Sequence, residues 1–158
     1  MIKSLVTYFS ASGVTAEVAA RLAEGVGAEL CEIVPEPPYS DADLNWMDKN
    51  SRSTLEMKDE NARPALAKKD IPVGEYDIIF VGFPIWWYRE PSIIDTFLEA
   101  YDFTGKTIIP FATSGGSALG KAPARMAELS KAKVLPGRVF PPKVSERELK
   151  DWVRSLPI

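Results

Sequence analysis

A short stretch near the start of the chain, residues 8–15 (YFSASGVT), gathers hydroxyl groups directly after an apolar run. Ser10, Ser12 and Thr15 carry these hydroxyls, and no lysine or arginine lies among them. If the turn opens a helix, the unpaired N–H groups and the positive end of the helix dipole favour an anion there. Gly13 allows close approach of the backbone. The stretch predicts a phosphate held by hydrogen bonds alone; a simpler interpretation is that Ser12 or Thr15 merely caps the helix.

Two later stretches have the residue types that hold a flat ligand. The first places three aromatic rings together after an apolar run, in the sequence Pro84, Ile85, Trp86, Trp87 and Tyr88. Three rings at a strand end predict contact with a flat ligand or with another surface. The second is a loop of small residues that can press backbone N–H groups onto a planar edge: Thr113, Ser114, Gly115, Gly116 and Ser117. Neither loop nor the first turn has the spacing of a Walker A or dinucleotide-binding glycine motif.

The absence of histidine limits the chemistry of the chain. It excludes Ser-His-Asp and Cys-His catalysis and histidine-based metal sites. The single cysteine, Cys31, forms no internal disulfide, which agrees with a reducing compartment, and its apolar neighbours favour a buried strand position over a nucleophile. Any chemistry therefore relies on carboxylates, lysines, hydroxyls, backbone dipoles or a bound cofactor.

Strands and helices alternate along the chain and would position these loops. The apolar patterns predict strands at residues 3–9, 28–34, 76–83, 106–113 and 133–140. They predict helices at residues 14–26, 91–101, 118–131 (with the true start near Pro123) and from Ser145 to about 155. Such apolar strands are typical of a parallel sheet buried on both faces. We therefore expect a three-layer, doubly wound α/β sandwich.

Length and composition fit a single domain over residues 1–158. The net charge of −3 and the lack of a basic block argue against nucleic-acid binding, and the apolar runs are too short to span a membrane. The chain enters a strand at once without a signal peptide, so we expect a cytoplasmic location. A long polar connection, residues 35–73, is expected to carry a helix at about residues 43–57.

Three segments together resemble a flavodoxin-like family with Trp-Trp and Thr-Ser-Gly-Gly-Ser motifs: NARPAL (61–66), FPIWWYREP (83–91) and YDFTGKTIIPFATSGGS (101–117). The resemblance spans nearly the whole chain and implies a five-stranded parallel sheet of order 2-1-3-4-5 and non-covalently bound flavin mononucleotide (FMN). It implies phosphate contacts at Ser10, Ser12, Gly13, Val14 and Thr15. It implies contacts to the isoalloxazine ring at residues 84–88 and 113–117. A phosphate bound without cations would help to keep the flavin potential low.

Three features depart from the family pattern. A net charge of −3 is weak for steering basic partner proteins. The loop at residues 113–117 has no aromatic side chain to cover the outer face of the ring, which leaves that face open to a small substrate. Finally, Trp87 and Tyr88 stand where the family often has Gly or Asn near the flavin N5, and a positive φ is costly for such residues.

These departures leave two redox functions open. One is electron transfer between partner proteins, which the resemblance slightly favours. The other is an NAD(P)H- or protein-coupled flavin reductase that passes electrons to a quinone-like small acceptor. In both, the flavin carries the chemistry and no residue acts as an acid or base. The oligomeric state stays open.

A third possibility from another class is a non-enzymatic protein-binding module that uses Trp86, Trp87 and Tyr88 as an interface. A receiver domain is disfavoured because residues 9–10 and 83–84, at the ends of two predicted strands, include no acid. A low-molecular-weight phosphatase is excluded because no arginine follows Cys31 at short range.

Several further residues have open interpretations. Asn61 and Arg63 are candidates for contacts with the flavin edge. For Arg63, a structural salt bridge is an equally good interpretation. Arg89 and Glu90 are interpreted as a solvated edge of the aromatic loop. Packing on the core or a helix face is expected for three large side chains: Trp46, Phe97 and Trp152.

Overall fold

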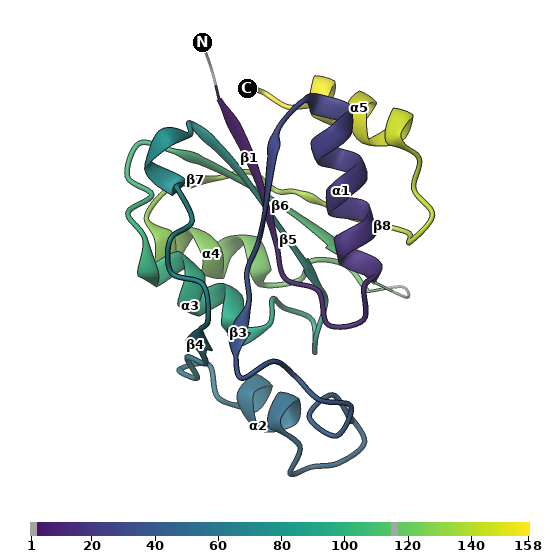
Figure 1. The fold of residues 1–158 in the computed structure, drawn as a ribbon, viewed down its shortest axis with the longest axis vertical. Helices are drawn as coiled ribbons and strands as arrows, with labels where there is room; N and C mark the ends of the chain where they lie inside the picture. The colour runs from purple at the N-terminus through teal and green to yellow at the C-terminus, as the bar shows by residue number, and fades with distance from the viewer. Residues whose placement is uncertain (1–2, 115–116) are drawn as a thin grey trace.

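A parallel β-sheet forms the centre of the computed structural model, which describes residues 3–114 and 117–158 (Figure 1). The strands follow the order β2 (Glu29–Glu32), β1 (Ser4–Tyr8), β5 (Ile78–Pro84), β6 (Thr107–Thr113) and β7 (Lys133–Val134), and β8 (Arg138–Phe140) also pairs with β6. Every pairing in this sheet is parallel. The predicted order 2-1-3-4-5 is therefore confirmed, with β7 and β8 together in the fifth place.

The fifth strand is divided because of a proline in its neighbour. Pro110 lies in the middle of β6 and has no N–H to donate. The register gains one extra residue on the outer strand between the pairs Ile108–Val134 and Phe111–Arg138. Gly137 crosses this point with φ +73°, and a Cβ there would lie 2.2 Å from the Pro110 carbonyl oxygen. The interruption therefore requires glycine.

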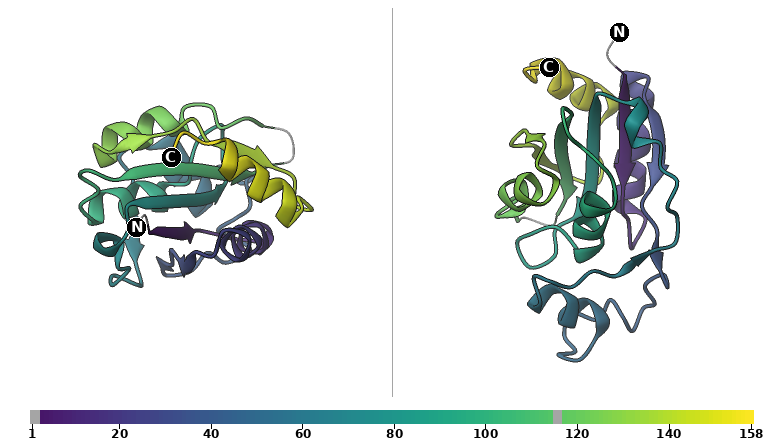
Figure 2. Two further views of the ribbon diagram at one scale, coloured as in Figure 1. Left: turned by 90° about the horizontal axis from the view of Figure 1, so that it is seen from above. Right: turned by 90° about the vertical axis from the view of Figure 1, so that its left-hand side faces the viewer.

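Helices cover both faces of the sheet and make the three layers expected (Figure 2). One face carries α1 (Val14–Val26) and α5 (Glu146–Ser155), and the other carries α3 (Ser92–Ala100) and α4 (Ala122–Ser130). The Ser145 hydroxyl caps α5 by accepting the Glu148 N–H, as predicted. Helix α4 begins next to Pro123, also as predicted. None of the helices in the described ranges is long and apolar enough to cross a membrane.

The core lies on both sides of the three central strands. Val6 and Phe80 pack under α1 and α5, and Ile79 and Ile108 pack under α3 and α4. Phe97 and Trp152 are buried in these layers, as expected. The edge strand β2 differs from the prediction of strands buried on both faces: Leu30 is 40% exposed and Cys31 is only half-buried.

The long connection after β2 makes a projecting arm, which we call the α2 arm (residues 37–64). It leaves the sheet through β3 (Pro35–Glu36) and returns through β4 (Ala65–Leu66), which pair antiparallel before the 3₁₀ turn η1 (Val73–Glu75). Figure 1 shows the arm at the end of the molecule opposite both termini. This is the end at which β1, β5 and β6 finish, so the arm lies beside the loops of the predicted site.

The helix within the arm is shorter than predicted. Helix α2 covers only Arg52–Lys58, and residues 43–51 form turns. Asn45 and Asp48 bond through their side chains to the backbone N–H groups of Met47 and Asn50, at 3.1 and 2.9 Å. Such local bonds compete with helix formation. The expected helix start at residue 43 is therefore wrong, and the true start is capped by Ser51.

Candidate functional site

The hydroxyl turn (residues 10–13) connects β1 to α1. Gly13 is the N-cap residue with φ +92°, and its N–H donates to the Ser10 hydroxyl at 3.1 Å. Within the part of the chain that the structure describes, no side chain caps α1, so the interpretation of Ser12 or Thr15 as a simple cap is wrong. The first-turn N–H groups of a helix have no partner within it. The turn thus presents backbone donors, and Ser12 is exposed beside them.

Thr15 has a different environment from the rest of this turn. Its side chain is buried, and its hydroxyl shares a hydrogen bond of 2.8 Å with the hydroxyl of Thr113 at the end of β6. The bond joins the helix that follows β1 to the strand that precedes the small-residue loop. Two segments that the sequence predicts to hold opposite parts of one ligand are therefore fixed to each other.

The aromatic turn (residues 86–89) follows β5 as a tight hairpin. Trp86 and Arg89 exchange two backbone hydrogen bonds, of 3.1 and 3.2 Å. Between them Trp87 and Tyr88 have φ values of +49° and +66°. Two left-handed residues in succession define a type I′ turn, which usually contains Asn and Gly. The positive φ values that are costly for Trp87 and Tyr88 are therefore present in the folded chain.

A glycine on the following segment makes room for this strained turn. Gly120 has φ +57°, and a Cβ on it would lie 2.3 Å from the Tyr88 carbonyl oxygen. The next residue, Lys121, donates its N–H to the same oxygen at 3.4 Å. The conformation of the aromatic turn therefore depends on close backbone contact with the start of α4.

A cavity of about 460 Å³ opens between these loops and the α2 arm. Among the predicted site residues, it is lined by Ser12, Pro84, Ile85, Trp86, Trp87, Tyr88 and Ser117. It is also lined by residues that the sequence did not assign to the site: Ala11, Leu44, Trp46 and Ser53. The last three belong to the arm. No charged residue in the described part of the chain lines this cavity.

The aromatic side chains of this cavity are not equally exposed. Trp87 and Tyr88 are 43% and 71% exposed, whereas Trp86 is half-buried. The Trp86 ring lies edge-on to Phe9 and Tyr39, with centroids 5.6 and 5.4 Å away. Trp46 is 71% exposed, so the expectation that it packs on the core or a helix face is wrong. Two walls of the cavity therefore carry exposed indole rings.

Tyr39 fixes the arm against the aromatic turn. Its hydroxyl donates a short hydrogen bond to Glu56, and the Arg52 guanidinium lies 4.0 Å from the centre of its ring. Burial, together with the Glu56 carboxylate, raises the pKa of Tyr39 well above its ordinary value. Tyr39 therefore stays protonated and keeps the arm in contact with Trp86.

Ser53 is the unusual polar residue of the cavity. It lies on α2 with 2% of its surface exposed, and its N–H donates to the Asp43 carbonyl at 3.0 Å. Its hydroxyl oxygen, in contrast, has no hydrogen-bond partner among the described residues. A buried hydroxyl without a partner is uncommon in folded proteins and costs free energy.

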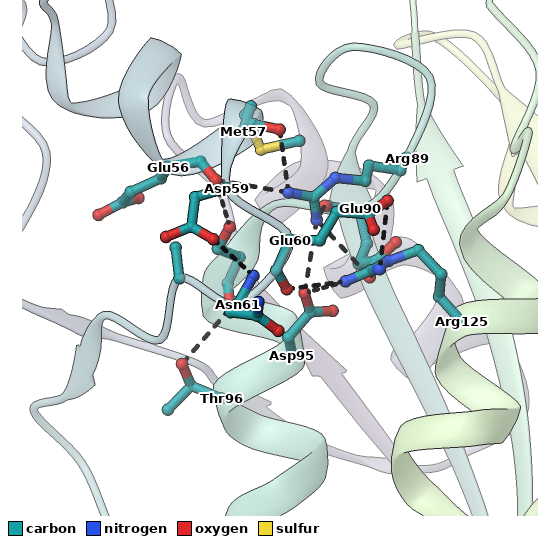
Figure 3. A network of polar contacts seen from close by, with 12 residues as sticks. Glu56, Met57, Asp59, Glu60, Asn61, Arg89, Glu90, Asp95, Thr96 and Arg125 are labelled. Atoms are coloured by element: carbon teal, nitrogen blue, oxygen red, sulfur yellow. Dashed lines mark hydrogen bonds and ion pairs between the residues drawn. The ribbon is translucent and has the colours of Figure 1, made fainter.

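Behind the aromatic rings lies an ionic cluster of three buried residues, Arg89, Glu90 and Asp95, and the half-buried Arg125 (Figure 3). Arg125 contacts Glu90 at 3.0 Å and Asp95 at 2.7 Å, and Arg89 lies 3.4 Å from Asp95. The interpretation of Arg89 and Glu90 as a solvated edge is therefore wrong: they are 4% and 0% exposed. Burial and the neighbouring Asp95 carboxylate raise the pKa of Glu90 to about 8.

The cluster also holds the arm in place. The Arg89 guanidinium donates to the Met57 carbonyl at 3.2 Å, at the end of α2 (Figure 3). Arg63 pairs with Glu99 at 2.6 Å, which confirms its interpretation as a structural salt bridge. Asn61 is exposed, and its N–H donates to Asp59. Neither Arg63 nor Asn61 lines the cavity.

The remaining predicted site residues in the described part of the chain are not among those that line the cavity. Ser10, Gly13 and Val14 belong to the hydroxyl turn and the first turn of α1, and Thr113 is buried behind it. Ser114 accepts the Ser117 N–H at 2.7 Å, which closes the small-residue loop. Gly115 and Gly116 lie outside the described residues. The assignment of these residues to a ligand stays a prediction.

Comparison with known proteins identifies the family. Residues 3–156 match the family described as flavodoxin. The chain belongs to the flavodoxin family. A curated relative was not found for it.

Solved structures show the same architecture. A protein assigned as a flavoprotein from Bacteroides uniformis ATCC 8492 is 45% identical, with a TM-score of 0.92 over 98% of this chain and 99% of that one. A similarly assigned protein from Bacteroides eggerthii DSM 20697 is 41% identical, with a TM-score of 0.92 over 99% and 98%. A flavoprotein from Lactobacillus acidophilus NCFM, in complex with FMN, is 22% identical with a TM-score of 0.69 over 97% and 99%, which shows the common fold alone.

Proposed function

We propose that this protein binds FMN non-covalently and works as a redox protein. The observation that carries the proposal is the position of the uncharged cavity, directly beside the hydroxyl turn and the uncapped start of α1. In doubly wound sheets, ligands bind beyond the carboxyl ends of the strands. Family membership and the FMN complex of the Lactobacillus acidophilus flavoprotein support the choice of cofactor.

The residues of the hydroxyl turn fit the phosphate group of FMN. Gly13 has open space around it, with no atom within 4 Å of an added Cβ, so a ligand can approach the backbone there. Ser12 is exposed beside the first-turn N–H groups of α1. Phosphate contacts are assigned to Ser10, Ser12, Gly13, Val14 and Thr15, with Thr15 also bonded to Thr113.

The aromatic turn and the small-residue loop fit the flavin ring. Trp87 and Tyr88 offer exposed aromatic surface, and Ile85 is held to β6 by its N–H, which donates to the Thr113 carbonyl at 3.1 Å. When bound, FMN supplies one- and two-electron transfer chemistry. The protein's part is to orient the cofactor, exclude water from its faces and set the surrounding charge.

Of the two redox roles, the cavity favours transfer to a small acceptor. The α2 arm contributes Leu44, Trp46 and Ser53 to its lining, beside the loops assigned to the flavin. Electron transfer to a partner protein needs only an exposed ring edge and gains from strong charge complementarity, whereas the net charge here is −3. A small neutral acceptor suits an uncharged cavity better.

The proposal is tested by titrating purified protein with FMN and with riboflavin, which lacks the phosphate. We expect a flavin absorption spectrum with one FMN bound per chain. Ser12→Ala should weaken FMN binding about tenfold, because a hydrogen bond to a charged group is lost, and should leave riboflavin binding unchanged. Ser4→Ala, at the opposite end of the sheet, is the matched control.

Two results would reject the proposal. A colourless protein that takes up no FMN would leave the exposed aromatic residues as an interface of a binding module. If Ser12→Ala weakens the binding of FMN and riboflavin equally, the hydroxyl turn does not bind the phosphate.

A further inference from the structure

Two buried carboxyl groups of the ionic cluster, those of Glu90 and Asp95, are only half satisfied (Figure 3). Both residues are 0% exposed. When both are ionised, Glu90 Oε1 and Asp95 Oδ1 have no hydrogen-bond partner among the described residues. The two guanidinium groups of the cluster donate to the other oxygen of each carboxyl, Glu90 Oε2 and Asp95 Oδ2. A buried acceptor without a partner costs free energy, so two in one cluster need an explanation.

A single proton held between the two carboxyl groups satisfies both oxygens. A protonated carboxyl becomes a hydrogen-bond donor, so an O–H of Glu90 can donate to Asp95. This hydrogen bond is, after burial, the next cause that raises the pKa of Glu90 to about 8. Two carboxyl groups that occupy one site are rarely both ionised, because their charges repel each other. The geometry and the direction of the pKa therefore agree.

Other charged groups face this pair from each element packed against it. They come from the end of the aromatic turn, α3, α4 and the α2 arm: Arg89, Glu99, Arg125, Glu60 and Arg63. The Glu60 and Glu99 side chains are 59% and 46% exposed, so water screens their charges. Glu90 and Asp95 are thus the carboxyl groups that compete for the guanidinium groups away from water.

The α2 arm is attached to the same guanidinium groups through longer hydrogen bonds. Arg89 donates to the carbonyls of Met57 and Glu56 at 3.2 and 3.4 Å. Arg125 donates to the Glu60 carbonyl at 3.5 Å, compared with 2.7 Å to Asp95. The arm leaves and rejoins the rest of the fold through strands of two residues each, whereas α3 and α4 pack on the core. The arm is therefore the covering of the pair that is easiest to displace.

We propose that Glu90 and Asp95 share one proton and that this proton keeps the α2 arm closed. Its loss leaves two buried negative charges, which need water or a larger share of the guanidinium groups. Both needs weaken the hydrogen bonds to the arm. Because Leu44, Trp46 and Ser53 of the arm line the cavity, opening of the arm removes one of its walls. The shape of the cavity thereby depends on pH.

The direction of this dependence follows from the two pKa values of Glu90. In the closed arm the pKa is about 8, and in the open arm, where water reaches the carboxyl, it returns toward its ordinary 4.5. Between these values opening releases a proton, so opening becomes easier as pH rises, by at most about tenfold per pH unit. Near pH 8 the closed form also loses its proton and the dependence levels off.

The test is hydrogen–deuterium exchange of the backbone amides of the α2 arm, measured on the full chain at pH 5, 6.5 and 8. Glu90→Gln carries an amide that donates to Asp95 as the protonated carboxyl does, so it should keep the arm closed. The ratio of exchange rates, parent over variant, cancels the direct effect of pH on exchange. We expect this ratio to rise at least about tenfold from pH 5 to pH 8.

Asp95→Asn tests whether the proton is shared. Its amide donates to an ionised Glu90, so the pH dependence should vanish in this variant as well. Exposed Glu24→Gln is the control that should keep the dependence of the parent protein. If Asp95→Asn keeps it too, burial alone holds the proton on Glu90, and the proposal is overturned.

Infrared spectra at pH 6.5 detect the proton directly. The parent protein should show the band of a protonated carboxyl, and Glu90→Gln and Asp95→Asn should lack it. If the parent lacks this band, a buried water molecule rather than a proton joins the two oxygens, which would overturn the proposal. This measurement decides the question even where one variant does not fold.

Two exchange results would also overturn it. One is a ratio for the arm that stays constant from pH 5 to pH 8. The other is an equal rise for the amides of β5 and β6, because global unfolding rather than opening of the arm would then explain it. All proteins are compared with the same amount of bound flavin. Failure of the proposed function therefore leaves this test intact.

Discussion

Two neighbouring parts of one segment have opposite surroundings. Residues 84–88 line an open cavity in which no described lining residue is charged, while Arg89 and Glu90, the next two residues, are buried in a cluster of four charged groups. The first part offers exposed aromatic rings to a ligand. The second holds the loop, α3, α4 and the end of helix α2 together.

The comparison shows that the charged side chains of this segment lie in the ionic cluster and not in the cavity. A cation beside a flavin stabilises its reduced, more negative form and raises its reduction potential, so charges that support the loop leave the potential low when they are kept away from the cavity. In the ionic cluster, the Arg89 guanidinium contacts Asp95 and the Met57 carbonyl at the end of helix α2, and Arg125 contacts Asp95 and Glu90 (Figure 3). Rigidity and an uncharged site are thereby obtained from adjacent residues.

The largest expected effect comes from a substitution in the ionic cluster. Arg125→Met removes the 2.7 Å partner of Asp95 and the 3.0 Å partner of Glu90 while keeping a long side chain. Removing one member of a buried ion pair leaves an uncompensated charge and typically costs about 3–5 kcal/mol. We expect a loss of this size in the free energy of unfolding, measured with urea.

Arg147→Met, at an exposed position of α5, is the control and should stay within about 0.5 kcal/mol of the parent protein. A loss below about 1 kcal/mol for Arg125→Met would mean that the cluster is solvated and that its apparent burial is irrelevant to stability.

The next effect concerns the close contact between Gly120 and the aromatic turn. Gly120→Ala places a Cβ 2.3 Å from the Tyr88 carbonyl and also forces alanine into a positive φ, so it should cost roughly 2–4 kcal/mol and weaken FMN binding. Gly105→Ala has φ +79° with no atom within 4 Å of the added Cβ, and should cost only about 1–2 kcal/mol.

The difference between the two glycine variants isolates the contact with the aromatic turn. Urea unfolding gives the stabilities, and a titration with FMN shows whether the turn has moved. Equal stabilities and equal FMN affinities would show that the turn does not depend on Gly120.

A smaller effect follows from the raised pKa of Glu90. In the folded protein this pKa is raised from its ordinary 4.5 to about 8, with Asp95, Arg89 and Arg125 facing the group. Between these pH values the folded protein keeps a proton that the unfolded chain releases. Stability therefore falls as pH rises through this window, by less than about 1.4 kcal/mol per pH unit, the value for one whole proton.

Glu90→Gln, which imitates the protonated carboxyl, should flatten this fall. Unfolding by urea at pH 5, 6.5 and 8 provides the measurement, and exposed Glu24→Gln is the control that should keep the parent slope. A slope unaffected by Glu90→Gln would assign the pH dependence to another group.

The comparison also shows what the sequence could predict. The helix start at Pro123 and the Ser145 cap follow from local patterns of proline and capping side chains, whereas the strand order is implied by the family resemblance. The aromatic and hydroxyl-rich loops could be found because their composition is unusual for strand ends. Such signals need only a few neighbouring residues.

The parts that the sequence did not reveal depend on distant contacts. Arg89 and Glu90 look like ordinary surface charges until Arg125 is placed beside them by the packing of α4. Trp46 reaches the cavity because the arm is held by Arg89, which lies 32 residues after its partner Met57. The Thr15 hydroxyl shares a hydrogen bond with Thr113, which lies 98 residues later in the chain. A signal that could have drawn attention to the arm is the exposed pair Trp46 and Met47 in a polar segment.

The smallest expected effect concerns the cavity, whose described lining residues carry no charge. Ala11 lies in the hydroxyl turn and lines the cavity, so Ala11→Lys would place a cation beside the proposed flavin. At an effective dielectric constant of about 20, a unit charge about 10 Å from another is worth roughly 1.7 kcal/mol before screening by salt. The flavin of the FMN-loaded protein should therefore be reduced at a potential some tens of millivolts higher. Ile158→Lys adds the same charge at the opposite end of the molecule and should leave the potential unchanged (Figure 1). If both variants shift it equally, net charge sets the potential, and the lack of cations in the hydroxyl turn has no special role.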